Sequence, residues 1–362
     1  MKAKLSHGQG CLLGLAIGDA MGMPVQGKTL KQICADYGPN GLLGYDLTAS
    51  SAEVSSYTQI AAFVGNGLLL SVARGKTDYH SYIVTALREW ARNQKHHKDP
   101  ERSYCWVAKP KCLRLHNNQD SAMLDSFFLC QLGSPEQPSS QNTATGMLTA
   151  AAPLAVFAYA HKMQRAALAE LAGQTAALTH GRPEAFLSTA LLALWLEELL
   201  ADPQEPLEDV FLNGLEQITE QYAQAYPQAI EKIAQRLHTA MELAQNKSDP
   251  VWTDMEQLQG ETALDCLAGS VYALLCSEED FDTAMVTAVN HSGASAGVGA
   301  VTGAILGVVL GADALPEFYL ESLVPVKELE VLAQDLIEGR MTSGLFDNEW
   351  DHKYIQGLPP EI

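Results

Sequence analysis

The fold is decided by the stretch Asn290-His-Ser-Gly-Ala-Ser-Ala-Gly-Val-Gly-Ala-Val-Thr-Gly-Ala304, because it opens a regular row of glycines. The row repeats every four residues, at Gly299, Gly303, Gly307 and Gly311, and a matching row lies at Gly14, Gly18 and Gly22. Glycine inside a helix costs about 1 kcal/mol relative to alanine, so its repeated use on one face indicates that two backbones approach closely. We therefore expect helices Leu12–Gly22 and Val298–Gly311 to pack against each other at the centre of the protein.

The remainder of the chain is also helical in pattern, because apolar residues recur at spacings of three and four and strand-like alternation is scarce. The expected helices include Ala166–Leu178, Glu184–Leu200, Ala223–Leu243 and Glu261–Leu275. The second of these opens at Pro183, with Thr179 or His180 near its cap. Turn-rich surface loops are expected at Gln94–Ser103, Asn117–Asp120 and Gly133–Gln141. With no fixed-period repeat, the sequence favours one compact all-α helical bundle over residues 1–362.

Composition narrows the classes of partner and the compartment. Lys and Arg number 23 against 43 Asp and Glu, giving a net charge of -20. Such a surface repels phosphate backbones and anionic lipid headgroups, so nucleic acid and membrane surfaces are excluded as partners. Seven cysteines without a CxxC pair indicate reduced thiols. The apolar stretch Cys11–Ile17 is too short for a signal peptide, and no run reaches the ~18 apolar residues of a membrane span. We expect a cytoplasmic protein.

Several stretches, in order, resemble motifs of the ADP-ribosylglycohydrolase family. They are Gly14–Gln26 (family G-x-x-x-G-D-A-x-G-x-P-x-E), Ser55–Gln59 (T-D-D-T-Q), Thr145–Leu154 (N-G-x-x-M-R-x-A-P-L), Thr179–Pro183 (T-H-G-H-P) and Asn290–Ala304 (N-x-G-G-D-T-D-T-x-G-A-x-x-G-A). Gly260–Ala268 also fits the helix that precedes the last motif. The resemblance extends over residues 8–320 and implies the all-α fold of that family.

The resemblance also implies a chemistry. Family members hold two Mg²⁺-type ions in a pocket that grips ADP-ribose, and water cleaves the N- or O-glycosidic bond. Divalent cations of this kind prefer oxygen ligands, and carboxylates offset their charge in a partly buried site. The metals orient the ribose and lower the pKa of the attacking water. A nearby glutamate serves as acid or base.

This chain departs from the family at every one of those charged positions. The T-D-D positions hold Ser55, Ser56 and Tyr57, and the D-T-D positions hold Ala294, Ser295 and Ala296. The glutamate of the first motif is Gln26, the arginine of the middle motif is Ala150, and the second histidine of T-H-G-H-P is Arg182. Hydroxyl, methyl and amide groups cannot offset the charge of two divalent ions. We therefore expect no catalytic residue, metal or cofactor at these positions.

Other polar residues could still line a pocket. We expect it to comprise Gln26, Ser55, Ser56, Tyr57, Asn142, His180, Gly293 and Ser295. Asp19 survives from the first motif, but its place inside a helix favours a structural hydrogen-bonding role, and Glu53 is typical of a solvated surface residue. His180 and His291 offer nitrogen ligands better suited to zinc than to magnesium, but a histidine in such a position is more often structural.

The sequence leaves three functions open and does not decide whether the chain is an enzyme. It could bind ADP-ribose or a related small ligand without the family's hydrolysis. It could be an active ADP-ribosyl hydrolase with an altered mechanism or substrate. It could have a structural or protein-interaction role with a closed pocket. A retained pocket separates the first two from the third, and turnover separates the second from the first.

Overall fold

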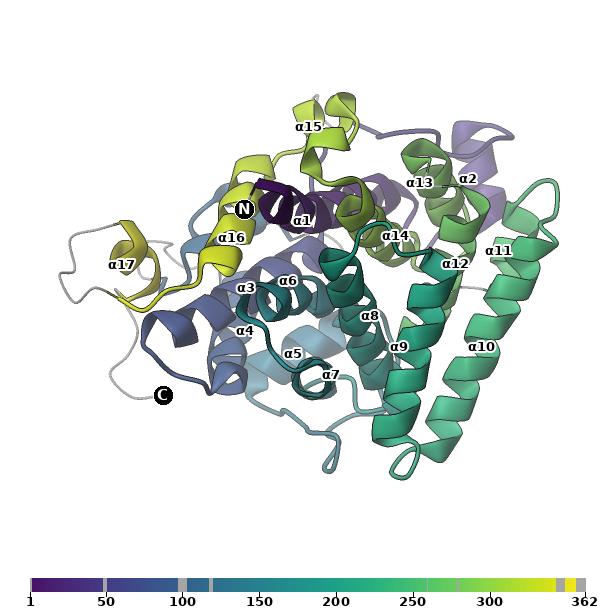
Figure 1. Ribbon diagram of the computed structural model, residues 1–362. Helices are drawn as coiled ribbons and strands as arrows, with labels where there is room; N and C mark the ends of the chain where they lie inside the picture. The colour runs from purple at the N-terminus through teal and green to yellow at the C-terminus, as the bar shows by residue number, and fades with distance from the viewer. Residues whose placement is uncertain are drawn as a thin grey trace.

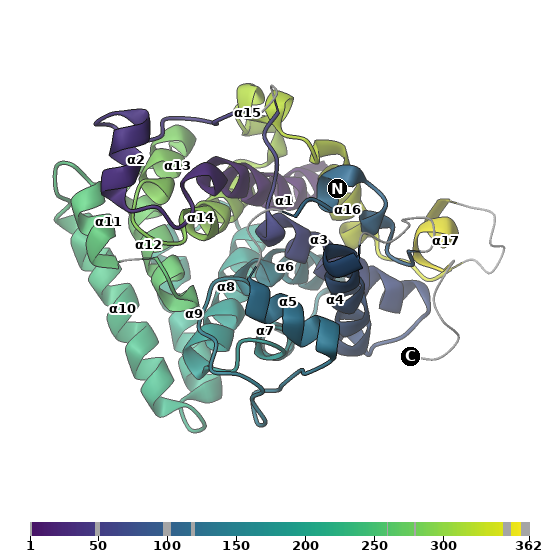
Figure 2. The ribbon, with the colours of Figure 1, turned by 180° about the vertical axis from the view of Figure 1, so that it is seen from behind.

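Helices α1 (Lys2–Gly22) and α14 (Ser295–Leu310) lie side by side in the computed structural model, as both ribbon views show (Figure 1, Figure 2). The structure describes residues 2–47, 51–96, 103–116, 120–258, 260–278, 280–342 and 349–355. The predicted packing of the two glycine-rich helices is confirmed. Because the two helices come from opposite ends of the chain, they bring the first and last motifs together.

The contact between α1 and α14 uses glycine on both sides. A Cβ built on Gly18 would lie 1.9 Å from the carbonyl oxygen of Gly299, and one on Gly14 would lie 2.0 Å from that of Gly303. Gly10 meets Gly307 in the same way, at 1.9 Å. These pairs run in opposite directions along the two helices, so the helices are antiparallel and their backbones touch.

The predicted glycine row is wrong at its last member. Gly311 lies outside α14 with a φ of 77° and ends the helix, so Leu310 is its final residue. A left-handed conformation is the usual helix terminator, and glycine adopts it without a steric penalty. On α1, the row of contacting glycines also includes Gly10, which was not predicted and which packs against Gly307.

Fifteen further α-helices surround this pair in the described part of the chain. They are α2 (Leu30–Tyr37), α3 (Ser56–Ala73), α4 (Tyr79–His96), α5 (Ser121–Leu129), α6 (Ala151–His161), α7 (Arg165–Ala177), α8 (Pro183–Ala201), α9 (Leu207–Tyr222), α10 (Pro227–Gln245), α11 (Trp252–Leu258), α12 (Ala263–Cys276), α13 (Phe281–Val289), α15 (Glu317–Ser322), α16 (Val326–Glu338) and α17 (Glu349–Tyr354). Helices α3, α6, α8 and α16 contact α1, and α12 and α13 pack on α14. The only strand-like pairing in the described residues is one bridge, Ala52 to Leu323. The predicted all-α fold is confirmed.

Most of the predicted helices are found, with one exception. Residues 223–226 form a turn between α9 and α10, so the predicted helix Ala223–Leu243 is wrong at its start. The reason is Pro227, which begins α10 and disfavours helical geometry at the preceding residue. Helix α8 begins at Pro183 as expected, and its N-cap is Arg182, two residues after His180.

The predicted loops are partly confirmed. Residues 133–141 carry no helix, as expected. Helix α4 continues through His96, so the first residues of the predicted loop Gln94–Ser103 are helical. Residues 97–102 and 117–119 lie outside the described residues. Among the helices that are described, none combines the length and apolar character needed to cross a membrane.

Candidate functional site

The first motif and the last motif meet at the N-terminus of α14. Helix α1 ends at Gly22 and passes through a short turn at Met23–Val25 to Gln26. The side-chain oxygen of Gln26 accepts a hydrogen bond from the backbone N–H of Ala296 at 2.8 Å. The adjacent Gly27 N–H donates to the carbonyl oxygen of Gly293, also at 2.8 Å. The N-cap residue of α14 is Ala294, whose methyl group cannot accept a hydrogen bond. The side chain of Gln26 therefore caps this helix instead.

The second motif is held by Asp19 of α1, which is fully buried. Its carboxylate accepts hydrogen bonds from the backbone N–H and hydroxyl groups of both Ser55 and Thr58, at the N-terminus of α3. Burial raises the pKa of Asp19, and the hydrogen bonds from Ser55 and Thr58 oppose that rise. The structural interpretation of Asp19 is confirmed. The hydroxyl of Ser55 therefore already donates a hydrogen bond, to Asp19.

Tyr57 extends from the start of α3 towards α14. Its side chain is 5% exposed, and its hydroxyl shares a hydrogen bond with the hydroxyl of Thr145. A Cβ built on Gly297 would lie 3.2 Å from the Tyr57 hydroxyl oxygen, so the ring packs against the first turn of α14. Burial raises the pKa of Tyr57, and the charge of Asp120 adds to the rise, so the phenol is neutral. The second and last motifs thus lie in contact.

The first turn of α14 offers no charged group. Ala294 and Ala296 are 6% and 0% exposed and present only methyl groups. The hydroxyl of Ser295 donates to the carbonyl oxygen of His291 at 3.2 Å. His291 is fully buried, and its Nδ1 lies 2.9 Å from the carbonyl oxygen of Ser292.

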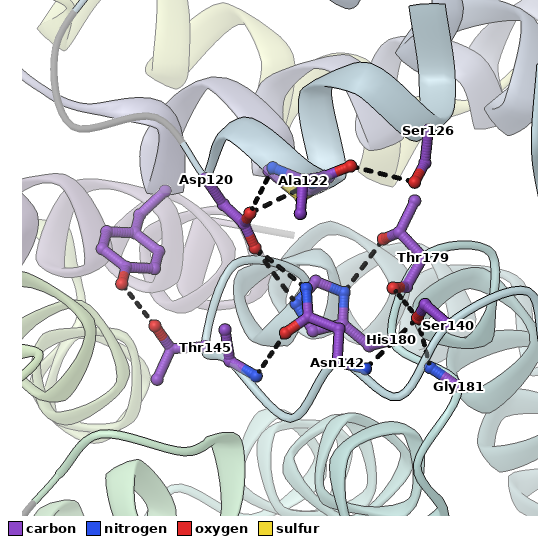
Figure 3. Close-up of polar contacts among 12 residues, drawn as sticks. Asp120, Ala122, Ser126, Ser140, Asn142, Thr145, Thr179, His180 and Gly181 are labelled. Atoms are coloured by element: carbon purple, nitrogen blue, oxygen red, sulfur yellow. Dashed lines mark hydrogen bonds and ion pairs between the residues drawn. The ribbon is translucent and has the colours of Figure 1, made fainter. Parts of the chain in front are cut away.

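A second polar group surrounds Asp120, which the sequence analysis did not single out as a site residue. Figure 3 shows Asp120 at the start of α5, facing Asn142 and His180. One carboxylate oxygen caps α5 by accepting from the N–H groups of Ala122 and Met123, at 2.9 and 3.0 Å. The other oxygen accepts from the Asn142 amide at 3.0 Å and lies 3.8 Å from Nε2 of His180. From its place in the sequence, Asp120 is typical of a helix N-cap and of nothing more.

His180 is nearly inaccessible, with 1% of its side chain exposed. Its Nδ1 lies 2.9 Å from the hydroxyl of Thr179, whereas its Nε2 has no hydrogen-bond partner. Burial lowers the pKa of His180 to about 4, against the opposite effect of the Asp120 charge. The imidazole is therefore neutral at physiological pH.

The predicted pocket residues consequently lie in three places. Gln26, Gly293 and Ser295 lie at the N-terminus of α14, whereas Asn142 and His180 lie around Asp120. Ser55, Ser56 and Tyr57 lie at the start of α3. Thr145 hydrogen-bonds to Tyr57 and lies 3.3 Å from a Cβ built on Gly297, so it links the start of α3 to α14. A cavity of about 270 Å³ is lined by residues that do not include Asp120, Asn142 or His180. They are Thr143, Arg182, Glu184, Ala185, Lys232, Thr262 and Leu264.

Comparison with known proteins places the chain in a family. The family model described as ADP-ribosylglycohydrolase matches residues 1–345, so the chain belongs to the ADP-ribosylglycohydrolase family. A solved structure titled "ADP-ribosylglycohydrolase-related protein complex" is similar in fold, with a TM-score of 0.57 and 24% sequence identity. The match covers 94% of this chain and 100% of that one. A search of the curated proteins finds no match.

The residues at the family's metal-binding positions do not fit a pair of divalent ions. Such ions need several anionic oxygens, whereas Ser56, Tyr57, Ala294 and Ala296 carry no charge at neutral pH. Two carboxylates lie next to these motifs, and both are already engaged. Asp19 accepts four hydrogen bonds, and Glu256 accepts two from Ser292. The described residues contain no group of three or more His, Cys, Asp or Glu that could hold a metal ion.

Proposed function

We propose that this member of the ADP-ribosylglycohydrolase family binds ADP-ribose or a related small ligand and does not carry out the family's metal-dependent hydrolysis. One observation carries the proposal. The polar atoms of Gln26, Ser55 and Tyr57 are bonded within the protein, while the group around Asp120 and His180 keeps an unused nitrogen beside a carboxylate. The first set supports the fold, and the second leaves one buried polar atom without a partner.

The neutral replacements support the loss of hydrolysis. Cleavage of a glycosidic bond builds positive charge on the anomeric carbon and negative charge on the leaving atom. Metals and carboxylates stabilise both charges in the family, and a hydroxyl, a phenol and two methyl groups stabilise neither. The hydrogen bonds made by Asp19 and Gln26 hold the N-termini of α3 and α14 in place.

Binding at the Asp120 side of the site is consistent with its exposure. The side chain of Asp120 is 21% exposed, whereas that of His180 is 1% exposed. Solvent therefore reaches the Asp120 carboxylate, whereas the imidazole of His180 is covered. Buried polar atoms are normally hydrogen-bonded, so the unpartnered Nε2 of His180 is the atom that a ligand would satisfy.

Magnesium is expected to leave the melting temperature unchanged. A ligand that binds only the folded state raises that temperature, and the donors at the family's metal positions give Mg²⁺ nothing to bind. The measurement is thermal unfolding with and without millimolar MgCl₂. A variant carrying S56D, Y57D, A294D and A296D is the matched comparison and should gain a magnesium-dependent rise. A clear rise in the wild-type protein would contradict the proposal.

ADP-ribose is expected to bind with the same affinity whether or not Mg²⁺ is present, as measured by titration calorimetry. His180→Phe should weaken this binding by about tenfold or more, because a buried hydrogen bond to the ligand is lost. His238→Phe is the matched control, since His238 is an exposed histidine on α10. If ADP-ribose produced no heat and no shift in melting temperature, this ligand would be wrong, and a structural role would be favoured.

A further inference from the structure

Exposed apolar side chains gather on α15 and on the segment packed beside it. Of the seven large apolar side chains that are exposed in the described residues, four lie in two short segments, 43–47 and 318–324. They are Leu43, Leu47, Phe318 and Val324. Apolar side chains that are exposed together, and not scattered singly, are typical of a surface that another molecule covers. We call these four side chains the α15 face.

The two segments that carry the α15 face lie against each other. The rings of Tyr45 and Tyr319 meet edge to face, with their centroids 5.0 Å apart. Leu43 and Leu47 each lie two residues from Tyr45, and Phe318 adjoins Tyr319. The ring contact therefore brings the two halves of the face together.

Backbone hydrogen bonds fix this arrangement. The N–H of Ala52 donates to the carbonyl oxygen of Ser322 at 2.8 Å, and the N–H of Val324 donates to that of Ala52 at 3.1 Å. Tyr319 is the only buried residue of α15, and both ribbon views place this helix at the margin of the molecule (Figure 1, Figure 2). The face is thus held in place while its apolar side chains meet solvent, and Phe318 is 53% exposed.

The surroundings of the α15 face are acidic. Residues 32–73 and 248–326, which supply both of its segments, contain no Lys or Arg. Phe281 at the start of α13 packs on Tyr319, with ring centroids 5.8 Å apart, and brings the acids beside it close to the face. The exposed acids next to these residues in the chain are Asp46, Asp280, Asp282, Glu317 and Glu321. The face therefore combines apolar side chains with negative charge that no base in these two stretches offsets.

This charge decides what can cover the face. Two copies of the chain that met through it would bring Glu317 and Glu321 towards their counterparts, and like charges repel across an interface. Nucleic acid and anionic lipid surfaces are repelled for the same reason. A standard protein interface uses about 20–30 residues on each side, far more than these two short segments offer. A short polypeptide segment that is both basic and apolar meets all of these conditions.

We propose that the α15 face binds a short basic segment of another protein. Apolar side chains of that segment pack on Phe318, and its Lys or Arg side chains lie beside Glu317 and Glu321. Phenylalanine is enriched at the centres of protein interfaces, which favours Phe318 as the anchor. Opposite charges raise the rate of association and select the partner. The inference goes beyond the proposed function, which concerns a small ligand, and does not depend on it.

Synthetic peptides test the chemistry of the partner. The first probe is a fluorescein-labelled peptide with Leu at helical spacing and Lys elsewhere, and fluorescence anisotropy measures its Kd. A Lys–Ser peptide keeps the charge and loses the apolar side chains, and a Glu–Leu peptide keeps the apolar side chains and reverses the charge. We expect the Lys–Leu peptide to bind about tenfold more tightly than the Lys–Ser peptide, and the Glu–Leu peptide not to bind.

Apolar variants locate the binding site. Phe318→Ser should raise the Kd of the Lys–Leu peptide about tenfold, the usual effect of losing an anchor side chain. Leu212→Ser is the matched control and should leave the Kd unchanged, because Leu212 is an exposed apolar residue on α9. In the wild-type protein, the peptide should also slow hydrogen exchange at the backbone amides of residues 318–324.

Charge variants test the acidic side of the face. Glu317→Gln combined with Glu321→Gln should raise the Kd of the Lys–Leu peptide about two- to fivefold, because exposed ion pairs contribute modestly. Glu216→Gln combined with Glu220→Gln is the matched control, since these two glutamates are exposed on α9 at the same spacing. The control pair should leave the Kd unchanged.

Three results would overturn the inference. The first is equal binding of the Lys–Leu and Lys–Ser peptides, which would mean that only the net charge of the protein attracts them. The second is an equal Kd for Phe318→Ser and Leu212→Ser, which would place the peptide elsewhere. The third is a wild-type dimer in light scattering that Phe318→Ser converts to a monomer, because the occupant of the face would then be a second copy of the chain.

Discussion

Replacing Gly18 with alanine is expected to lower the free energy of unfolding by about 3 kcal/mol or more, because the new methyl group would overlap a backbone atom. A Cβ at this position would lie 1.9 Å from the Gly299 carbonyl oxygen. The obstacle is another helix backbone and not a side chain that can rotate away, so α1 and α14 would have to separate. Urea denaturation followed by circular dichroism measures the change.

Gly173→Ala provides the matched control for this prediction. Gly173 also lies inside a helix, α7, but a Cβ there would come no closer than 3.8 Å to its neighbours. Alanine should therefore stabilise the protein at this position by up to ~1 kcal/mol through its higher helix propensity. Equal stability changes in the two variants would show that the α1–α14 contact tolerates side chains.

The wild-type protein is expected to leave ADP-ribosylated arginine and serine peptides uncleaved, with or without Mg²⁺. Losing one preorganised electrostatic group usually costs about 3 kcal/mol of transition-state stabilisation, which is more than a hundredfold in rate. Here several such groups are replaced at once, by Gln26, Ser56, Tyr57, Ala294 and Ala296. The measurement is release of free ADP-ribose, beside a family relative that retains the aspartates.

The variant carrying S56D, Y57D, A294D and A296D is the comparison within this chain. If the scaffold is otherwise intact, the four carboxylates should give magnesium-dependent release above the wild-type level. Circular dichroism must show the same helix content, because Y57D removes the bond to Thr145. Wild-type turnover that matches the relative would mean that the neutral site is catalytic by another mechanism.

The packing of the two central helices could be predicted because it rests on local spacing. Glycines at every fourth residue report a close backbone contact whatever the surrounding fold. Pro227 in the sequence marks the start of α10. The helix was nevertheless predicted to begin earlier, because the apolar pattern continues across the preceding turn. Spacing alone was misleading at Gly311. This residue fits the four-residue repeat, but its φ of 77° excludes it from the helix.

The candidate site was predictable in part, for a different reason. The motifs indicated which segments meet at α14, and the structure places both Gln26 and Tyr57 against the first turn of that helix. Asp120 escaped notice because it lies in no motif and precedes α5 as an ordinary helix cap. The partners of its second carboxylate oxygen, Asn142 and His180, lie on other loops and come close to Asp120 only in the folded protein.

The α1–α14 contact also constrains when the protein can fold during synthesis. Gly18 leaves the ribosome about 280 residues before Gly299, the residue that it must touch. At roughly 5–20 residues per second, α1 waits some tens of seconds for its partner. Throughout that interval the face of α1 formed by Gly10, Gly14 and Gly18 lacks the helix against which it packs. The nascent chain should therefore depend on chaperones that bind an early helix, and ribosome stalling before α14 should leave it prone to aggregation.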